Sequence, residues 1–123
     1  MTEIIKQQEI IKKAQVQLAE VIGKGKIVEE ADVSQLPYLK YIIKETLRMH
    51  PPVPFLIPRK VEQDIELCDY IIPKGSQILV NAWAIGLDST SWEDPLVFKP
   101  ERFWNLDVDM RGHDFELIPF GAG

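Results

Sequence analysis

The sequence predicts a mainly helical fold with a small antiparallel β-sheet, and three observations carry this prediction. Apolar residues recur at helical spacing in segments 2–22 and 35–49, which indicates two amphipathic helices. Between residues 55 and 81 the pattern changes to short β-rich runs separated by turn residues, which is typical of strands. From residue 87 to 123 no period is sustained, so this part is expected to form an irregular meander.

The first helix is expected to run from Thr2 to about Ile22. Its apolar stripe consists of Ile4, Ile11, Ala14, Leu18, Val21 and Ile22. Gly23 and Gly25 then supply the usual stop signal. An acidic connector at 29–32 leads to Ser34, whose hydroxyl is expected to cap the second helix.

The second helix is predicted from Gln35 to Met49. Pro37 falls within its first turn, where a missing N–H costs little. The expected apolar face consists of Leu36, Leu39, Ile42, Ile43 and Leu47. Prolines at positions 51, 52 and 54 end the helix.

The β-rich part contains three short runs at 64–67, 70–72 and 77–80. Ile72-Pro-Lys-Gly75 has Pro second and Gly fourth, which favours a type I turn between the last two runs. A short helix is expected after Asn81 and ends at Gly86.

Composition narrows the possible functions. The chain has 123 residues and a formal net charge of -5, which gives no basic surface for nucleic acid. Its apolar stretches are far shorter than the ~20 residues that cross a bilayer. Cys68 is the single cysteine, so no multi-cysteine metal site is possible, and His50 and His113 are too scattered to indicate zinc.

Glu45 and Arg48 stand three residues apart on the second predicted helix, so their side chains share a face. Taken alone, this E-x-x-R spacing favours an exposed ion pair worth about 0.2–0.5 kcal/mol. The surrounding sequence has to decide whether the two residues form an exposed ion pair or belong to a larger motif.

Four segments occur together in a fixed order: K-E-T-L-R-M-H-P-P at 44–52, P-K-G at 73–75, F-K-P-E-R-F at 98–103 and P-F-G-A-G at 119–123. In this respect the chain resembles the cytochrome P-450 family over its whole length. The resemblance implies a partial P-450 fold. Its expected parts are the helix J region at 1–25, helix K at 34–50, the β1-type sheet at 55–81, and the meander with the start of the cysteine loop at 82–123.

Segments 50–59, 81–85 and 115–119 look like those of the plant group that contains geraniol 8-hydroxylase and related terpenoid hydroxylases. This resemblance implies a monooxygenase that uses haem and dioxygen to hydroxylate a small hydrophobic substrate. It also implies electrons from an NADPH-dependent reductase and a place on the cytosolic face of the endoplasmic reticulum membrane.

The resemblance assigns a structural role to Glu45, Arg48 and Arg102, which in the family form a buried triad that supports the cysteine loop. Two arginines can each hold a carboxylate through charge-assisted hydrogen bonds, so the residue types suit that role. No catalytic residue is implied.

The resemblance also places residues around the cofactor and the substrate. Arg59 matches the residue that contacts a haem propionate, and Phe120, Gly121 and Gly123 begin the cysteine loop. The expected substrate pocket consists of Val53, Pro54, Phe55, Leu56 and Ile57. The alternative for Arg59 is a solvated arginine at a strand edge, and the alternative for residues 53–57 is ordinary core packing.

Cys68 is not expected to be the iron ligand. It lies in a predicted turn, whereas the family's ligand follows F-x-x-G-x-R-x, a pattern that reaches only Gly123 here. The chain is therefore expected to be a truncated monooxygenase, inactive alone, without the ligand cysteine and the oxygen-activating helix. The alternative is a non-catalytic interaction module or a degraded remnant.

Overall fold

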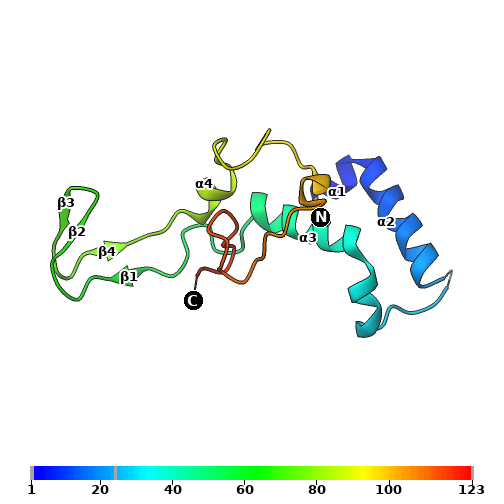
Figure 1. Cartoon of the computed structure of the whole chain (residues 1–123), viewed down its shortest axis with the longest axis horizontal. Helices are drawn as coiled ribbons and strands as arrows, with labels where there is room; N and C mark the ends of the chain where they lie inside the picture. Colours follow the sequence, from blue (N-terminus) through cyan, green and yellow to red (C-terminus); the bar gives the residue numbers. More distant parts are fainter. Residues whose placement is uncertain (1, 24, 123) are drawn as a thin grey trace. The chain divides into compact units, whose positions relative to one another are not determined.

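The computed structural model of the chain describes residues 2–23 and 25–122 (Figure 1). They fall into two compact units. The first consists of Met1–Thr46 with Val97–Asp107, and the second of Leu47–Leu96 with Val108–Gly123. The described part is mainly helical with two small antiparallel sheets, which confirms the predicted fold class.

The first unit begins with two helices, α1 (Thr2–Lys6) and α2 (Gln8–Val21), so the prediction of one continuous helix is wrong. Gln7 leaves the helical conformation, with φ −116° and ψ 84°. Its side-chain Nε2 donates a hydrogen bond to the carbonyl of Phe98 over 3.3 Å. The apolar spacing continues through this break, and therefore cannot reveal it. The predicted stop is confirmed, since Gly23 follows the helix with φ +90°.

The connector to the next helix contains a 3₁₀ helix, η1 (Glu30–Gln35). Asp32 accepts a hydrogen bond from the backbone N–H of Glu29 over 3.0 Å, as in a capping box. Ser34 lies inside η1 and donates to the carbonyl of Ala31, so its predicted role as the cap of the following helix is wrong. A short side chain in this region can bond to its own turn instead.

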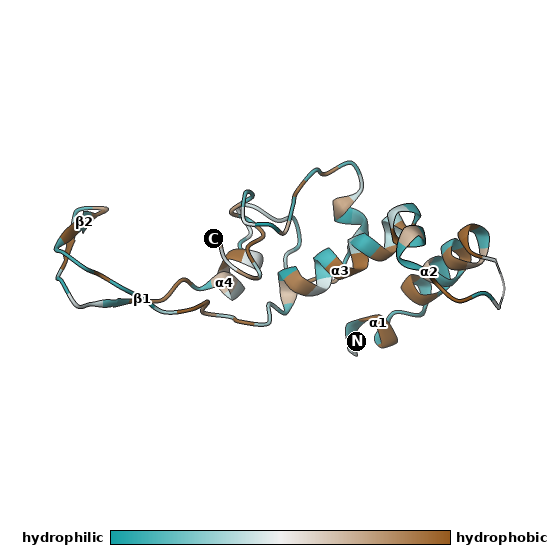
Figure 2. Ribbon diagram, turned by 90° about the horizontal axis from the view of Figure 1, so that it is seen from below, coloured by the Kyte–Doolittle hydropathy of each residue, from teal (hydrophilic) through white to brown (hydrophobic). Residues whose placement is uncertain are grey.

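Helix α3 (Pro37–Met49) begins with proline and carries its buried residues on one face. Tyr38, Ile42, Glu45 and Arg48 all lie on this face with little exposure. Ile43, which was expected on the apolar face, is 44% exposed. Figure 2 shows apolar and polar residues around α2 and α3, as expected of amphipathic helices. The E-x-x-R pair therefore belongs to the buried side of the helix.

Four short strands form the sheets of the second unit. Strands β1 (Arg59–Lys60) and β4 (Gln77–Ile78) pair antiparallel, with Arg59 opposite Ile78. Strands β2 (Ile65–Leu67) and β3 (Tyr70–Ile72) form a hairpin between them in sequence. The sequence missed β1, because two residues after a proline-rich segment give no alternating pattern.

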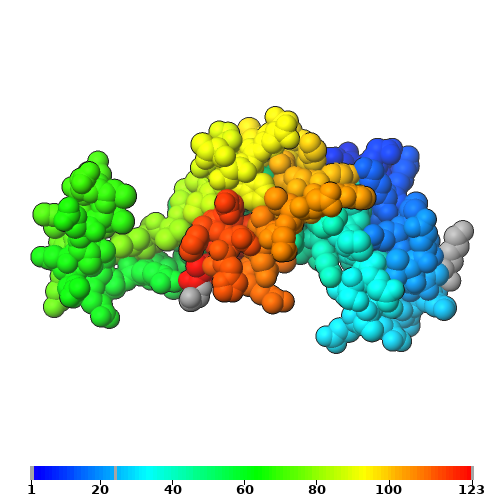
Figure 3. All heavy atoms as spheres, viewed as in Figure 1, coloured from blue at the N-terminus to red at the C-terminus, as the bar shows by residue number. Residues whose placement is uncertain are grey.

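Two turns shape this region. The turn before β4 spans Pro73–Ser76, where Ser76 N–H donates to the carbonyl of Pro73. Gly75 is its third residue with φ +89°, so the turn is of type II, and the predicted type I turn one residue earlier is wrong. The β2–β3 turn places Cys68 and Asp69 at φ +50° and +65°. In Figure 3 the β2–β3 hairpin stands out from the rest of its unit.

The remaining elements are short. Helix α4 (Ala82–Gly86) follows Asn81, whose side chain accepts a hydrogen bond from Ala84 N–H, which confirms the predicted short helix. In the first unit the P-E-R-F segment forms a 3₁₀ helix, η2 (Pro100–Phe103). Among the described residues, no helix is both long and apolar enough to cross a membrane.

Candidate functional site

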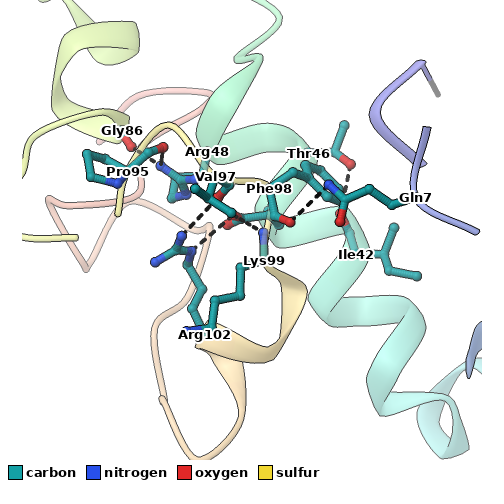
Figure 4. A network of polar contacts seen from close by, with 11 residues as sticks. Gln7, Ile42, Thr46, Arg48, Gly86, Pro95, Val97, Phe98, Lys99 and Arg102 are labelled. Atoms are coloured by element: carbon teal, nitrogen blue, oxygen red, sulfur yellow. Dashed lines mark hydrogen bonds and ion pairs between the residues drawn. The ribbon is translucent and has the colours of Figure 1, made fainter. Parts of the chain in front are cut away.

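The first site residue, Glu45, is fully buried and lies against η2. Its Oε1 accepts hydrogen bonds from Arg102 Nε over 3.0 Å and from the backbone N–H of Lys99 over 2.8 Å. Arg102 also donates from Nη2 to the carbonyl of Val97 over 3.0 Å (Figure 4). The side chains of Glu45 and Arg102 are 0% and 7% exposed, so water screens this ion pair little.

Arg48, in the second unit, is 1% exposed. Its Nη1 donates to the carbonyls of Gly86 and Pro95 over 2.5 and 2.8 Å (Figure 4). The guanidinium lies 5.5 Å from the centroid of the Trp92 ring, a cation–π geometry. A Cβ on Gly86 would lie 2.2 Å from the Arg48 carbonyl oxygen, so only glycine permits this approach of α4.

The structure also contains a polar cluster formed by Lys13, Tyr38 and Glu101, which the sequence did not reveal. Tyr38 Oη donates to Glu101 Oε1 over 3.1 Å, and Lys13 Nζ forms an ion pair with the same oxygen. The cluster joins α2, α3 and η2 within the first unit. Its members are far apart in sequence and belong to no motif, so only the folded chain reveals them.

The two acidic members of the cluster have shifted pKa values. Burial and then the Glu101 carboxylate raise the pKa of Tyr38 well above its ordinary value. Burial also opposes ionisation of Glu101, but the hydrogen bonds from Lys13 and Tyr38, together with a backbone hydrogen bond, outweigh it and lower the pKa of this carboxyl. Both shifts favour a phenol that donates to a carboxylate.

We expect this cluster to stabilise the first unit at neutral pH and to fail in acid. Because the folded pKa of Glu101 lies below its ordinary value of 4.5, the contribution is present above that pH and is lost as the pH falls through the folded pKa. The free energies of unfolding of wild type and Glu101→Gln, measured by chemical denaturation, should therefore differ at neutral pH and become equal in acid.

The control for this experiment is Glu9→Gln, which alters an exposed ion pair with Lys12. It should change the free energy of unfolding little at either pH. A Glu101→Gln effect that is equally large in acid would contradict the assigned role of the carboxylate charge.

The second unit contains a cavity of about 760 Å³. It is lined by Leu56, Ile57, Arg59, Val80, Ile85, Phe115, Ile118, Phe120, Gly121 and Ala122. Its wall is therefore apolar except for one guanidinium and backbone groups. A cavity of this size and lining suits an apolar ligand that carries a carboxylate.

The cavity brings together several residues that the sequence analysis had singled out. Arg59, Phe120 and Gly121, expected near the cofactor, all line it, as do Leu56 and Ile57 of the expected substrate pocket. Arg59 Nη2 donates to the carbonyl of Ala122 over 3.3 Å, which links β1 to the end of the described chain. Gly123 lies outside the described residues.

The cavity differs from the expected substrate pocket in two ways. Val53, Pro54 and Phe55 are not among its lining residues, and of the turn at 53–56 only Leu56 reaches the wall. Leu56 takes part in this turn with φ +52°, an unusual conformation for a leucine. Four further lining residues, Val80, Ile85, Phe115 and Ile118, were not predicted to face a pocket, although Ile85, Phe115 and Ile118 lie in segments that resemble the plant hydroxylases.

The lining fits the family's cofactor in part. The macrocycle of haem is apolar and flat, and its propionates carry negative charge, so apolar walls and Arg59 match both features. Cys68 is exposed on the β2–β3 turn and does not line the cavity. Among residues 2–23 and 25–122, no group of three or more acidic, histidine or cysteine side chains could hold a metal ion.

Comparison with protein families decides the classification, because the family model for Cytochrome P450 matches residues 1–123. The chain belongs to the cytochrome P450 family. Membership implies haem as the cofactor of the complete enzyme.

Several similar relatives of this P450 chain are plant enzymes. It is 64% identical to geraniol 8-hydroxylase of Catharanthus roseus and 63% identical to that of Swertia mussotii, over all 123 residues. It is 57% identical to geranylhydroquinone 3''-hydroxylase of Arnebia euchroma. The match covers 100% of this chain but 25% of each of these proteins, so the chain spans about a quarter of their length.

Two solved P450 structures contain the fold of this chain as a part of their own. A zebra fish cytochrome P450 structure with abiraterone superposes with a TM-score of 0.82 at 34% identity, over 96% of this chain and 26% of that chain. A second structure of a zebra fish cytochrome P450, with progesterone, gives the same TM-score at 35% identity. The predicted partial P450 fold is thereby confirmed.

Proposed function

We propose that this chain is the part of a haem-dependent monooxygenase that forms one wall of the haem site and holds a haem propionate. The complete enzyme would hydroxylate a small hydrophobic, terpenoid-like substrate. The observation that carries the proposal is the apolar cavity of about 760 Å³ with Arg59 in its lining, in a chain that belongs to the P450 family. The relatives named geraniol 8-hydroxylase support the terpenoid class.

Each cavity residue would have a defined task. Arg59 would bind a propionate, and its hydrogen bond to the Ala122 carbonyl would orient the guanidinium. Leu56, Ile57 and Phe120 would exclude water and favour an apolar ligand. Haem, when bound, would supply the activation of dioxygen for insertion of one oxygen atom into the substrate.

The remaining site residues would stabilise the fold and would not contact the cofactor. Glu45 and Arg102 bind η2 to α3, and Arg48 binds the carbonyls at the end of α4 and at Pro95. None of the three lines the cavity. We therefore assign Glu45, Arg48 and Arg102 a structural role in the complete enzyme, as the family resemblance implies.

Partners and location follow from the same proposal. The complete enzyme would receive its electrons from an NADPH-dependent reductase and would act at the cytosolic face of the endoplasmic reticulum membrane. A chimera tests the function directly: this chain replaces the matched quarter of Catharanthus roseus geraniol 8-hydroxylase, to which it is 64% identical. We expect this chimera to bind haem and to hydroxylate geraniol with a reductase.

The control variant of the chimera is Arg59→Gln, which keeps most of the side-chain volume but removes the charge. It should bind haem more weakly than the parent chimera, because a carboxylate loses a charge-assisted partner. A parent chimera that folds but takes up no haem would contradict the proposal, and an Arg59→Gln variant with unchanged haem affinity would remove Arg59 from it.

The 123-residue chain should give no thiolate-type Soret band when it is mixed with haem, reduced and exposed to carbon monoxide. Its one cysteine, Cys68, is exposed on a hairpin turn away from the cavity lining. Cys68→Ser should therefore leave any weak association with haem unchanged. A strong thiolate-type band that disappears in Cys68→Ser would identify this residue as a ligand.

A further inference from the structure

The loop at 109–114 precedes the P-F-G-A-G segment and contacts it at Gly112. A Cβ at this position would lie 2.7 Å from the carbonyl oxygen of Gly121 and 2.8 Å from Cα of Ala122. Both atoms belong to the backbone, so no rotation of a side chain could relieve the overlap. Gly112 also has φ +86°, a conformation that side chains rarely adopt. Glycine is therefore required here for two independent reasons.

The loop that carries Gly112 is held on both sides. Asp114 accepts a hydrogen bond through Oδ2 from the backbone N–H of Asp109, and Asp109 Oδ1 accepts one from Arg111 N–H over 3.2 Å. The carbonyl of Asp114 accepts a further hydrogen bond from Leu117 N–H over 3.0 Å, and Leu117 is only 2% exposed. The position of Gly112 against Gly121 and Ala122 thus follows from a closed loop with a buried anchor.

The segment that Gly112 contacts forms part of the cavity. Gly121 and Ala122 both line it, and the Ala122 carbonyl accepts the hydrogen bond from Arg59. A shift of this segment would therefore move the cavity wall and the guanidinium together. All of these residues belong to the second unit.

We propose that Gly112 is a positioning residue for the cavity: its missing side chain lets the 109–114 loop support Gly121 and Ala122, and thereby sets the wall and the orientation of Arg59. This inference rests on the proposed haem site for its functional meaning. The geometry of the contact is independent of that proposal.

Gly75 supplies a matched control in the same unit. It has nearly the same backbone conformation, with φ +89°, but a Cβ there would meet nothing within 4 Å. Gly112→Ala and Gly75→Ala therefore introduce similar backbone strain, and only the first introduces an overlap with backbone atoms. Their difference isolates the close contact.

Both substitutions are made in the chimera, and two quantities are measured. The first is hydrogen exchange of the Gly121 amide, which donates to the Ile118 carbonyl over 3.1 Å. We expect it to exchange at least about tenfold faster in Gly112→Ala than in Gly75→Ala. The second is haem affinity, which should be about tenfold lower in Gly112→Ala and unchanged in Gly75→Ala.

A third variant, Asp114→Ala, removes the loop-closing carboxylate without adding a side chain at Gly112. It should accelerate exchange of the Gly121 amide less than Gly112→Ala but in the same direction, and it decides the matter if Gly112→Ala does not fold. Equal exchange in Asp114→Ala and the parent chimera, or in Gly112→Ala and Gly75→Ala, would overturn the inference. A parent chimera without haem would refute the proposed function, while exchange would still test Gly112.

Discussion

Glu45→Ala in the chimera is expected to destabilise the fold by about 3–5 kcal/mol and to abolish stable haem incorporation. Glu45 is 0% exposed, and its carboxylate binds both the Arg102 guanidinium and the Lys99 N–H. Its removal leaves a buried cation and a buried donor without this acceptor. The haem-to-protein ratio after purification and the urea midpoint measure the two effects.

Two controls make the result specific. Glu20→Ala removes the same charge from an exposed position on α2 and should change stability by less than about 0.5 kcal/mol. Glu45→Gln keeps an oxygen acceptor but loses the charge, so it should lie between wild type and Glu45→Ala. Full haem content and an unchanged urea midpoint in Glu45→Ala would show that the buried ion pair does not stabilise the enzyme.

Arg48→Ala should have an effect of similar size, about 3–5 kcal/mol, through a different set of contacts. The guanidinium binds the carbonyls of Gly86 and Pro95 and stacks on Trp92, so truncation removes two hydrogen bonds and leaves a void. Urea denaturation of the chimera measures the loss.

Arg48→Lys tests whether charge alone is sufficient. Lysine keeps the positive charge but lacks the planar guanidinium, whose Nη1 reaches both carbonyls while the group lies over the Trp92 ring, so only part of the stability should return. Arg111→Ala is the control, since Arg111 is 84% exposed in its ion pair with Asp109. If Arg48→Lys were as stable as wild type, the planar guanidinium of Arg48 would be unnecessary and its charge would be sufficient.

Periodicity predicted most of the fold because the helices are amphipathic and their termini carry ordinary signals. The end of α2 shortly before Gly23 and the proline start of α3 follow from local backbone preferences that a sequence displays. The break at Gln7 depends instead on one residue whose side chain reaches Phe98, a tertiary contact. Strand β1 was missed because its two residues are too few to show alternation, and its pairing with β4 is visible only in the folded chain.

The candidate site likewise contains residues that the sequence could predict and residues that only tertiary contacts reveal. Motifs singled out Glu45, Arg102 and Arg59, because charged residues in a recurring pattern are visible in sequence, and the structure places the first two in one ion pair. The Lys13–Tyr38–Glu101 cluster and the requirement for Gly112 depend on distances between segments that no spacing rule connects. The exposed-pair alternative for Glu45 fails because its side chain is fully buried.

The β2–β3 hairpin is a suitable place to attach a spectroscopic probe to this protein. Its turn presents the only thiol of the chain in an exposed position, on a hairpin that stands out from the rest of its unit. A maleimide fluorophore or a nitroxide would therefore attach at a single known point. Such a probe would leave the cavity lining and the buried arginines chemically untouched, so that its mobility would report on the hairpin alone.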